Sequence, residues 1–354
     1  CVQTLIQQQH YLRQWQQQQP TQPINVPRPI VIFLAHDYQS NQHNIEQTLL
    51  QMGADDIFYN NNSVSDFVAK FEEQRETQLF LQRYPLQLDD YKIHGVIHDS
   101  ENAVIYHAVR LYQPYHSVAI KRFKYDLGNL PIQTIESLSY SLAKKANVKH
   151  YGVVQIENAG MTSEAFYLVM EYVAGADLKR IMDSHGTPPL TQAFAWFIEI
   201  TEALAAIHDT GLLHRDLKTS NILLRADGSL ALTDYGVEKS VLIDTGFLGE
   251  NEIFCTPYYV SPERITGEAC TTATDIYSLG IIFYELLTGQ KPFDGNSLTE
   301  LMTQHVLAPI PKLPEHLSTY QPLLEGMLDK LPEYRFNDCH KILAQLKQPM
   351  TDVA

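Results

Sequence analysis

Cysteine is scarce in this sequence of 354 residues, with only four, at positions 1, 255, 270 and 339. They show neither the CxxC spacing of metal or redox sites nor the dense pairing of small disulfide-bonded proteins. The sequence therefore predicts reduced, structural thiols and no disulfide framework. Because thiols stay reduced in the cytoplasm, we expect a cytoplasmic protein.

Long apolar runs are also missing. The longest, from Ile276 to Leu287, includes Tyr277 and Glu285 and is far shorter than the ~20 residues that span a bilayer. It predicts a buried core helix, and no membrane span is expected. Since the first residue is Cys1 and no basic stretch precedes an apolar signal region, we expect a fragment or a processed chain.

Positive charge is in deficit, because 26 Lys and Arg face 41 Asp and Glu, which gives a formal net charge of -15. Such a surface repels polyanions, so we expect no nucleic-acid partner, whereas a basic substrate is compatible with it. The length and the 44% hydrophobic content allow two domains or one large bilobal domain.

The first 28 residues contain ten glutamines and end in a proline cluster. Leu5, Leu12 and Trp15 fall near heptad spacing, which predicts an amphipathic helix followed by a loose connection. A glutamine-rich tract that packs against nothing is the alternative.

Residues 29–75 begin with an apolar strand at Ile30–Leu34, followed by a helix face that ends at Gly53. The pieces PIVIFLAHD, MGADDIFYNNN and SVSDFVAKFEEQ resemble the second half of a bacterial receiver domain, which implies a partial α/β segment. Leu34 and Asn60 replace the Thr or Ser and the Lys of that family, and its phosphoacceptor Asp would lie upstream. The resemblance implies a degenerate segment that docks a signalling partner; an unrelated small α/β piece is the alternative.

After a predicted linker at 76–90, apolar strands at Ile93–Ile97 and Val104–Ala108 flank the polar turn HDSEN. The sequence SVAIKRF predicts a third strand, from which Lys121 can project its charge toward phosphate groups. Fifteen residues later, Glu136 lies on a predicted helix, where it is placed to pair with that lysine.

The most specific pattern is LLHRDLKTSNILL, residues 212–224. Asp216 can accept the proton of an incoming hydroxyl, and Lys218 can neutralise charge on a transferring phosphoryl group. Asn221 offers an amide oxygen, and Asp234 in LTDYG, thirteen residues later, offers a carboxylate. Oxygen ligands of this kind suit Mg²⁺.

Together these motifs resemble the catalytic domain of eukaryotic-like, bacterial Ser/Thr protein kinases. The resemblance implies a kinase domain at 91–348 with an α+β, bilobal fold: a small antiparallel β lobe with one helix at 91–170 and a larger helical lobe at 174–348. It implies transfer of the γ-phosphate of ATP to Ser or Thr hydroxyls of a protein substrate, with Mg²⁺. The catalytic residues it implies are Asp216, Lys218, Lys121 and Glu136, and the metal ligands are Asn221 and Asp234.

The segment FYLVMEYVAGADL matches the adenine site of the same family. Met170 takes the gatekeeper place, the backbone groups of Glu171 and Val173 face the purine edge, and Asp177 can bond ribose hydroxyls. Apolar side chains would cover the two faces of the base, as in most nucleotide pockets. The predicted ATP-binding residues are Ile97, Ser100, Ala103, Ile105, Ala119, Lys121, Met170, Glu171, Val173, Asp177 and Leu223.

Further positions match the family in structural roles. Asp275, which opens DIYSLGIIFYELLTG, is expected to anchor the catalytic loop, and Arg335 is expected to pair with Glu263 of CTPYYVSPE. Thr256 is placed near the substrate hydroxyl. Tyr235 replaces the more usual Phe after the metal-binding Asp.

The glycine-rich loop of the family is the main departure, because His98, Ser100 and Ala103 stand at its three glycine positions. Loss of these glycines is expected to weaken the phosphate clamp. We expect an active kinase whose small-residue turn still covers ATP; the alternative is a pseudokinase that serves as a nucleotide-binding scaffold or docking module. Lys218 and Thr219 follow the Ser/Thr rather than the tyrosine-specific pattern.

Overall fold

The structure is a computed structural model that describes residues 32–35, 56–59, 87–100, 102–124, 145–161, 166–235 and 257–347. The chain divides into two compact units, Cys1–Ser117 and Val118–Ala354, and the division falls inside strand β6 (Gln113–Phe123). The predictions for residues 1–28, Glu136 and Thr256 lie outside the described residues.

The first unit holds two groups of strands. β1 (Ile32–Ala35) and β2 (Asp56–Tyr59) pair in parallel. β3 (Gln87–Leu88), β4 (Tyr91–Asp99) and β5 (Ala103–Arg110) form an antiparallel meander. The strands that the apolar runs predicted on either side of HDSEN are therefore confirmed.

In the second unit, β6 pairs antiparallel with β8 (Phe166–Glu171), and β8 pairs with β7 (Ile156–Met161). The hydrogen-bonded order of the six strands is β3-β4-β5-β6-β8-β7. The apolar run of β8 is buried from Phe166 to Met170, as expected for a strand that is covered on both faces. β9 (Ile222–Leu224) and β10 (Leu230–Leu232) form a separate antiparallel hairpin.

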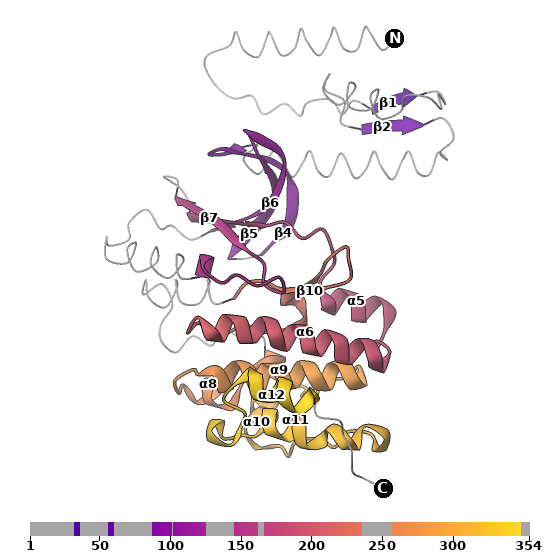
Figure 1. The fold of residues 1–354 in the computed structure, drawn as a ribbon, viewed down its shortest axis with the longest axis vertical. Coiled ribbons are helices and arrows are strands. Elements are labelled where there is room, and N and C mark those ends of the chain that lie inside the picture. The colour runs from indigo at the N-terminus through magenta and orange to yellow at the C-terminus, as the bar shows by residue number, and fades with distance from the viewer. Residues whose placement is uncertain are drawn as a thin grey trace. The chain divides into compact units, whose positions relative to one another are not determined.

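Helices make up most of the rest of the second unit (Figure 1). They are α5 (Leu178–His185), α6 (Leu190–Asp209), α8 (Pro262–Thr266), α9 (Thr272–Thr288), α10 (Leu298–Leu307), α11 (Gln321–Leu328) and α12 (Cys339–Lys347). Short 3₁₀ turns lie between them: η1 (Thr219–Asn221), η2 (Pro257–Tyr259), η3 (Glu315–Tyr320) and η4 (Pro332–Tyr334).

Helix α9 is the centre of this helical part, because α6, α11 and η2 all pack against it (Figure 1). Its residues are buried on nearly every side, which is typical of a core helix and confirms the prediction for the longest apolar run. Phe283 of α9 packs on Phe197 of α6 with ring centres 4.3 Å apart. Among the described helices, α6 alone is long and apolar enough to span a membrane by composition; 50% of that stretch is buried against protein, as in a core helix.

Candidate active site

The described residues of the catalytic loop form one polar cluster between α6 and β9. Lys218 Nζ lies 2.8 Å from Asp216 Oδ2. The side-chain amide of Asn221 donates to the carbonyl oxygen of Asp216 at 2.8 Å and to its carboxylate at 3.2 Å. Because both contacts use the amide nitrogen, the amide oxygen of Asn221 is left to face another partner, as a cation ligand requires.

Two residues beside this cluster have left-handed backbone, Arg215 with φ 64° and Asp234 with φ 61°. Such a conformation costs about 1–3 kcal/mol in a non-glycine residue and persists only where neighbours enforce it. Around Arg215 the backbone N–H donates to Asp275 Oδ1 at 2.8 Å, and the carbonyl accepts from Arg264 at 2.7 Å. The loop is therefore held in this shape by contacts from α8 and α9.

Asp275 lies in the first turn of α9, which begins at a reciprocal cap between Thr271 and Thr274. Its buried carboxylate accepts hydrogen bonds from the backbone N–H of His214 at 2.7 Å and from His208 Nε2 at 2.9 Å, besides that from Arg215. Burial opposes ionisation, but these bonds and the charge of His208 outweigh it and hold the pKa of Asp275 below its ordinary value. The predicted anchoring of the catalytic loop is confirmed.

Lys121 of β6 and Asp234 lie 113 residues apart in sequence, and their charged groups meet at 2.9 Å. The lysine side chain is only 5% exposed and that of the aspartate 24%. The backbone N–H of Thr233 donates to the carbonyl oxygen of Asn221 at 3.0 Å, which joins the segments of the two expected metal ligands. A carboxylate, an amide oxygen and two lysines nearby form a donor set that fits a magnesium phosphate ester.

Four of the predicted adenine- and ribose-binding residues of the second unit occur in two contacting pairs, and Glu171 and Val173 lie between them in the sequence. Ala119 of β6 lies directly opposite Met170 of β8, and Leu223 forms an isolated β-bridge with Asp177. Residues 171–177, which we call the hinge segment, run between these pairs. Asp177 Oδ1 accepts a hydrogen bond from the N–H of Arg180 at 2.9 Å and so caps α5, a role that sequence reasoning missed. Its contact with ribose stays a prediction.

The remaining predicted ATP-binding residues belong to the first unit. Ser100 and Ala103 close a tight turn between β4 and β5, in which the N–H of Ser100 donates to the Ala103 carbonyl at 2.9 Å and the N–H of Ala103 donates to the Ser100 hydroxyl at 3.2 Å. Ala103 is buried, Ile105 is half-buried, and Ile97 is 49% exposed. The Ser100 hydroxyl thus accepts the hydrogen bond of the Ala103 backbone N–H. A glycine at position 100 would leave that N–H available to another acceptor.

Comparison with known proteins decides the family. A family model described as protein kinase domain matches residues 101–346. The chain belongs to the protein kinase family. Its curated relatives include a probable serine/threonine-protein kinase PknB of Lactococcus lactis, 31% identical over 268 residues, which are 75% of this chain and 42% of that protein.

Two further relatives are also named serine/threonine-protein kinases and also align with this chain over only part of their length. Serine/threonine-protein kinase PrkC of Bacillus subtilis is 30% identical over 234 residues, which are 65% of this chain and 36% of that protein. Serine/threonine-protein kinase PkaA of Streptomyces coelicolor is 37% identical over 205 residues, 55% of this chain and 36% of that protein. The kinase chain therefore aligns with about two fifths of the length of these relatives or less.

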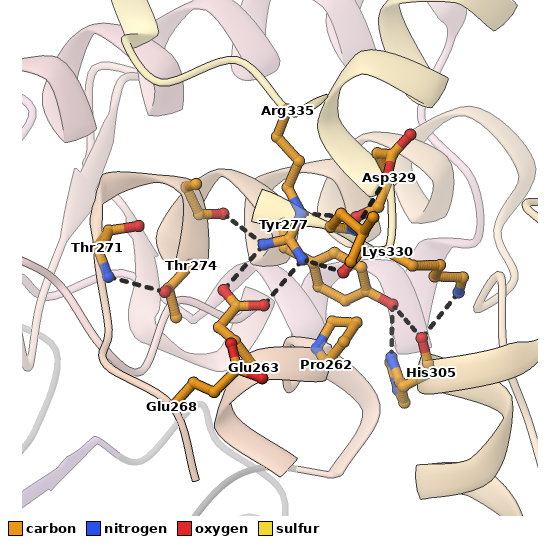
Figure 2. Close-up of polar contacts among 12 residues, drawn as sticks. Pro262, Glu263, Glu268, Thr271, Thr274, Tyr277, His305, Asp329, Lys330 and Arg335 are labelled. Carbon is orange, nitrogen blue, oxygen red and sulfur yellow. Dashed lines mark hydrogen bonds and ion pairs between the residues drawn. The ribbon is translucent and has the colours of Figure 1, made fainter. Parts of the chain in front are cut away.

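The kinase fold is further fixed by the predicted pair of Glu263 and Arg335, which Figure 2 shows at the junction of α8, α9 and η4. Arg335 donates two parallel hydrogen bonds to the carboxylate of Glu263, at 2.9 and 2.8 Å, and both side chains are buried. Its other donors reach the carbonyl oxygens of Ala273, Asp329 and Lys330. Burial alone would raise the pKa of Glu263, but the bonds and charge of Arg335 outweigh this and lower it. The predicted pairing is confirmed.

Sequence reasoning missed a second polar cluster beside the catalytic loop of the kinase. The hydroxyl of Tyr259 donates to Glu285 at 2.7 Å and lies 2.8 Å from the hydroxyl of Thr219, and Lys291 contacts both Tyr259 and Glu285. Since the single proton of Tyr259 goes to Glu285, Thr219 is the donor to Tyr259. A glutamate inside the apolar run IIFYELL was the available signal, because a buried carboxylate needs a partner.

Proposed function

We propose that this chain is a Ser/Thr protein kinase domain, which transfers the γ-phosphate of ATP to hydroxyls of protein substrates. The observation that carries the proposal is the Asp216, Lys218 and Asn221 cluster, together with the pair of Lys121 and Asp234. The names of the relatives support the Ser/Thr class, and the scarcity of cysteine supports action in the cytoplasm.

Each residue of the site has one part in the reaction. The substrate hydroxyl oxygen bonds to the γ-phosphorus, the bond from phosphorus to the bridging oxygen of ADP breaks, and Asp216 takes the hydroxyl proton. Lys218 and Lys121 offset the negative charge of the phosphates. Asn221 and Asp234 would hold Mg²⁺, which supplies charge neutralisation when it is bound. Glu136 is proposed to orient Lys121.

The proposal is tested with purified protein, Mg²⁺ and radiolabelled ATP, with and without a generic basic protein substrate. We expect label on Ser or Thr, and a loss of about 10²–10⁴-fold in Asp216→Asn, because that variant keeps the shape of the side chain and removes the proton acceptor. Binding of a fluorescent ADP analogue should be kept in this variant. If the unmodified chain binds nucleotide but transfers no phosphate, the proposed kinase activity is refuted, and a pseudokinase that serves as a nucleotide-binding scaffold is favoured.

For residues 29–75 we propose, from the receiver-like sequence, a docking site for a signalling partner. The parallel pairing of β1 with β2 is compatible with it. The kinase family match begins downstream, at residue 101. We expect such a partner to bind the segment without phosphorylating it, because Leu34 and Asn60 replace two residues that the receiver family uses for that chemistry.

A further inference from the structure

A bidentate ion pair holds the first residue of the hinge segment. Arg225, which follows β9, donates through Nη1 to Glu171 Oε1 and through Nη2 to Glu171 Oε2 at 3.1 Å. The side chain of Arg225 is 12% exposed and that of Glu171 is 31% exposed. Two parallel bonds from a planar guanidinium fix the direction of the carboxylate as well as its distance.

The same guanidinium reaches a third segment of the chain. Nη2 of Arg225 donates to the carbonyl oxygen of Tyr151 at 3.0 Å, and its carbon lies 4.7 Å from the centre of the Tyr151 ring. The Tyr151 hydroxyl donates in turn to Asp227 at 2.6 Å, and this bond, with those from Ser229, lowers the pKa of Asp227 to about 2. Arg225, in the turn between β9 and β10, thus joins that turn to the hinge segment and to the stretch before β7.

At its other end, the hinge segment is attached to β9, the strand that Arg225 follows. The backbone N–H of Leu224 donates to the carbonyl oxygen of Ala176 at 3.0 Å. Between the two attachments lie residues 172–175, which include Val173, whose backbone is expected with that of Glu171 to face the purine edge. One end of this stretch is held by the backbone hydrogen bond between Leu224 and Ala176, and the other by the ion pair between Arg225 and Glu171. The arginine therefore helps to determine the backbone conformation between them.

Among the residues that the structure describes, Glu171 has one weak alternative to the arginine. Its carboxylate also accepts from the backbone N–H of Gln155, but at 3.4 Å, which is long for a hydrogen bond. Without Arg225, a part-buried carboxylate would lose its counter-charge and turn toward water. Since Glu171 ends β8, that movement would pull on the start of the hinge segment.

We propose that Arg225 is a positioning residue of the nucleotide site, which holds the hinge segment in the shape that accepts adenine. The inference rests on the proposed function for the identity of the nucleotide. The ion-pair and hydrogen-bond partners that the structure describes for the guanidinium, Glu171 and Tyr151, are not groups of the phosphoryl transfer step. Removal of the arginine therefore weakens ATP binding and spares the transfer itself.

The test compares Arg225→Met, Arg225→Lys and, as a matched control, Arg180→Met, which removes an exposed arginine of α5. In Arg225→Met we expect KM for ATP and Kd for a fluorescent ADP analogue to rise about tenfold, the scale of charged hydrogen bonds, with kcat within about twofold. For Arg225→Lys we expect KM and Kd between those of the unmodified chain and Arg225→Met, since lysine keeps the positive charge but cannot form two parallel hydrogen bonds. Arg180→Met should bind as tightly as the unmodified chain.

An unchanged KM in Arg225→Met, a loss confined to kcat, or tighter nucleotide binding would overturn the inference. The exchange of charges in Glu171→Arg with Arg225→Glu should restore part of the affinity that each single change removes, and circular dichroism melting checks that each variant folds. If the unmodified chain transfers no phosphate but Arg225→Met weakens ADP binding, the proposed function fails and the inference stands. If it transfers phosphate and the variant binds ADP normally, only the inference fails.

Discussion

At the scale of single residues, Tyr235 carries a hydroxyl that the more usual phenylalanine of this kinase position lacks. Its ring is buried, and the hydroxyl donates to the carbonyl oxygen of Lys145 at 3.1 Å. Burial raises the pKa of Tyr235, so the hydroxyl stays a proton donor at any working pH. The bond attaches the residue that follows Asp234 to the stretch that leads into β7.

We expect Tyr235→Phe to lower the free energy of unfolding by about 1 kcal/mol, because it leaves a carbonyl oxygen without this donor. Urea unfolding followed by circular dichroism measures the change. Tyr334→Phe is the control, since Tyr334 is 68% exposed and should not alter the unfolding free energy. Equal stability of both variants would show that the Lys145 carbonyl finds another donor.

At the scale of elements, the hinge segment and β9 approach each other more closely than side chains allow. A Cβ added at Gly175 would lie 1.6 Å from the carbonyl oxygen of Leu224, which is a backbone atom and cannot rotate away. Glycine is therefore required here for close approach of two backbones. The site depends on this packing because the same contact region holds Ala176 and Leu224 together.

We expect Gly175→Ala to cost about 1–3 kcal/mol of unfolding free energy and to weaken binding of the ADP analogue, because the hinge segment must move off β9. Gly95→Ala is the matched control, since nothing lies within 4 Å of a Cβ added in that strand. Thermal melting and nucleotide titration measure the two effects. Normal nucleotide binding by Gly175→Ala would contradict the close packing of hinge and strand.

At the scale of the whole molecule, buried titratable groups tie stability to pH. His305 of α10 is fully buried, bonds the Tyr277 hydroxyl at 2.9 Å and lies beside Lys330, whose ammonium donates to the His305 carbonyl (Figure 2). Burial, with help from the charge of Lys330, lowers the pKa of His305 from 6.5 to about 4. Between these values the unfolded chain binds a proton that the folded chain does not, so stability falls as pH falls.

We expect His305→Asn to flatten the fall in unfolding free energy between pH 6.5 and about 4 by about 1.4 kcal/mol per pH unit, the contribution of one proton. Asparagine keeps a polar atom near the Tyr277 hydroxyl. Urea unfolding over this pH range measures the slope, and His316→Asn, at an exposed histidine, should leave it unchanged. Identical slopes for the two variants would rule out His305 as a source of acid sensitivity.

The sequence predicted much of the fold and site where local pattern and chemistry coincide. The apolar run of α9 indicated a buried helix, and HRDLKTSN indicated the groups around Asp216, because short spacings are fixed by the chain itself. Ser100 shows the limit: its identity was noted as a missing glycine, whereas its hydroxyl satisfies the Ala103 amide. Side-chain hydrogen bonds depend on turn geometry, which composition alone does not specify.

By itself the sequence determined which chemical groups this kinase carries near its expected site: the carboxylates of Asp216 and Asp234, the amide of Asn221 and two lysines, together with the Glu263 and Arg335 pair. Only the tertiary structure decided which side chains of distant segments bind each other, such as Arg225 with Glu171 and Tyr259 with Glu285. The physical reason is that a charged or polar side chain must find a partner once it is buried, but which partner it meets depends on the packing of strands and helices far apart in the chain.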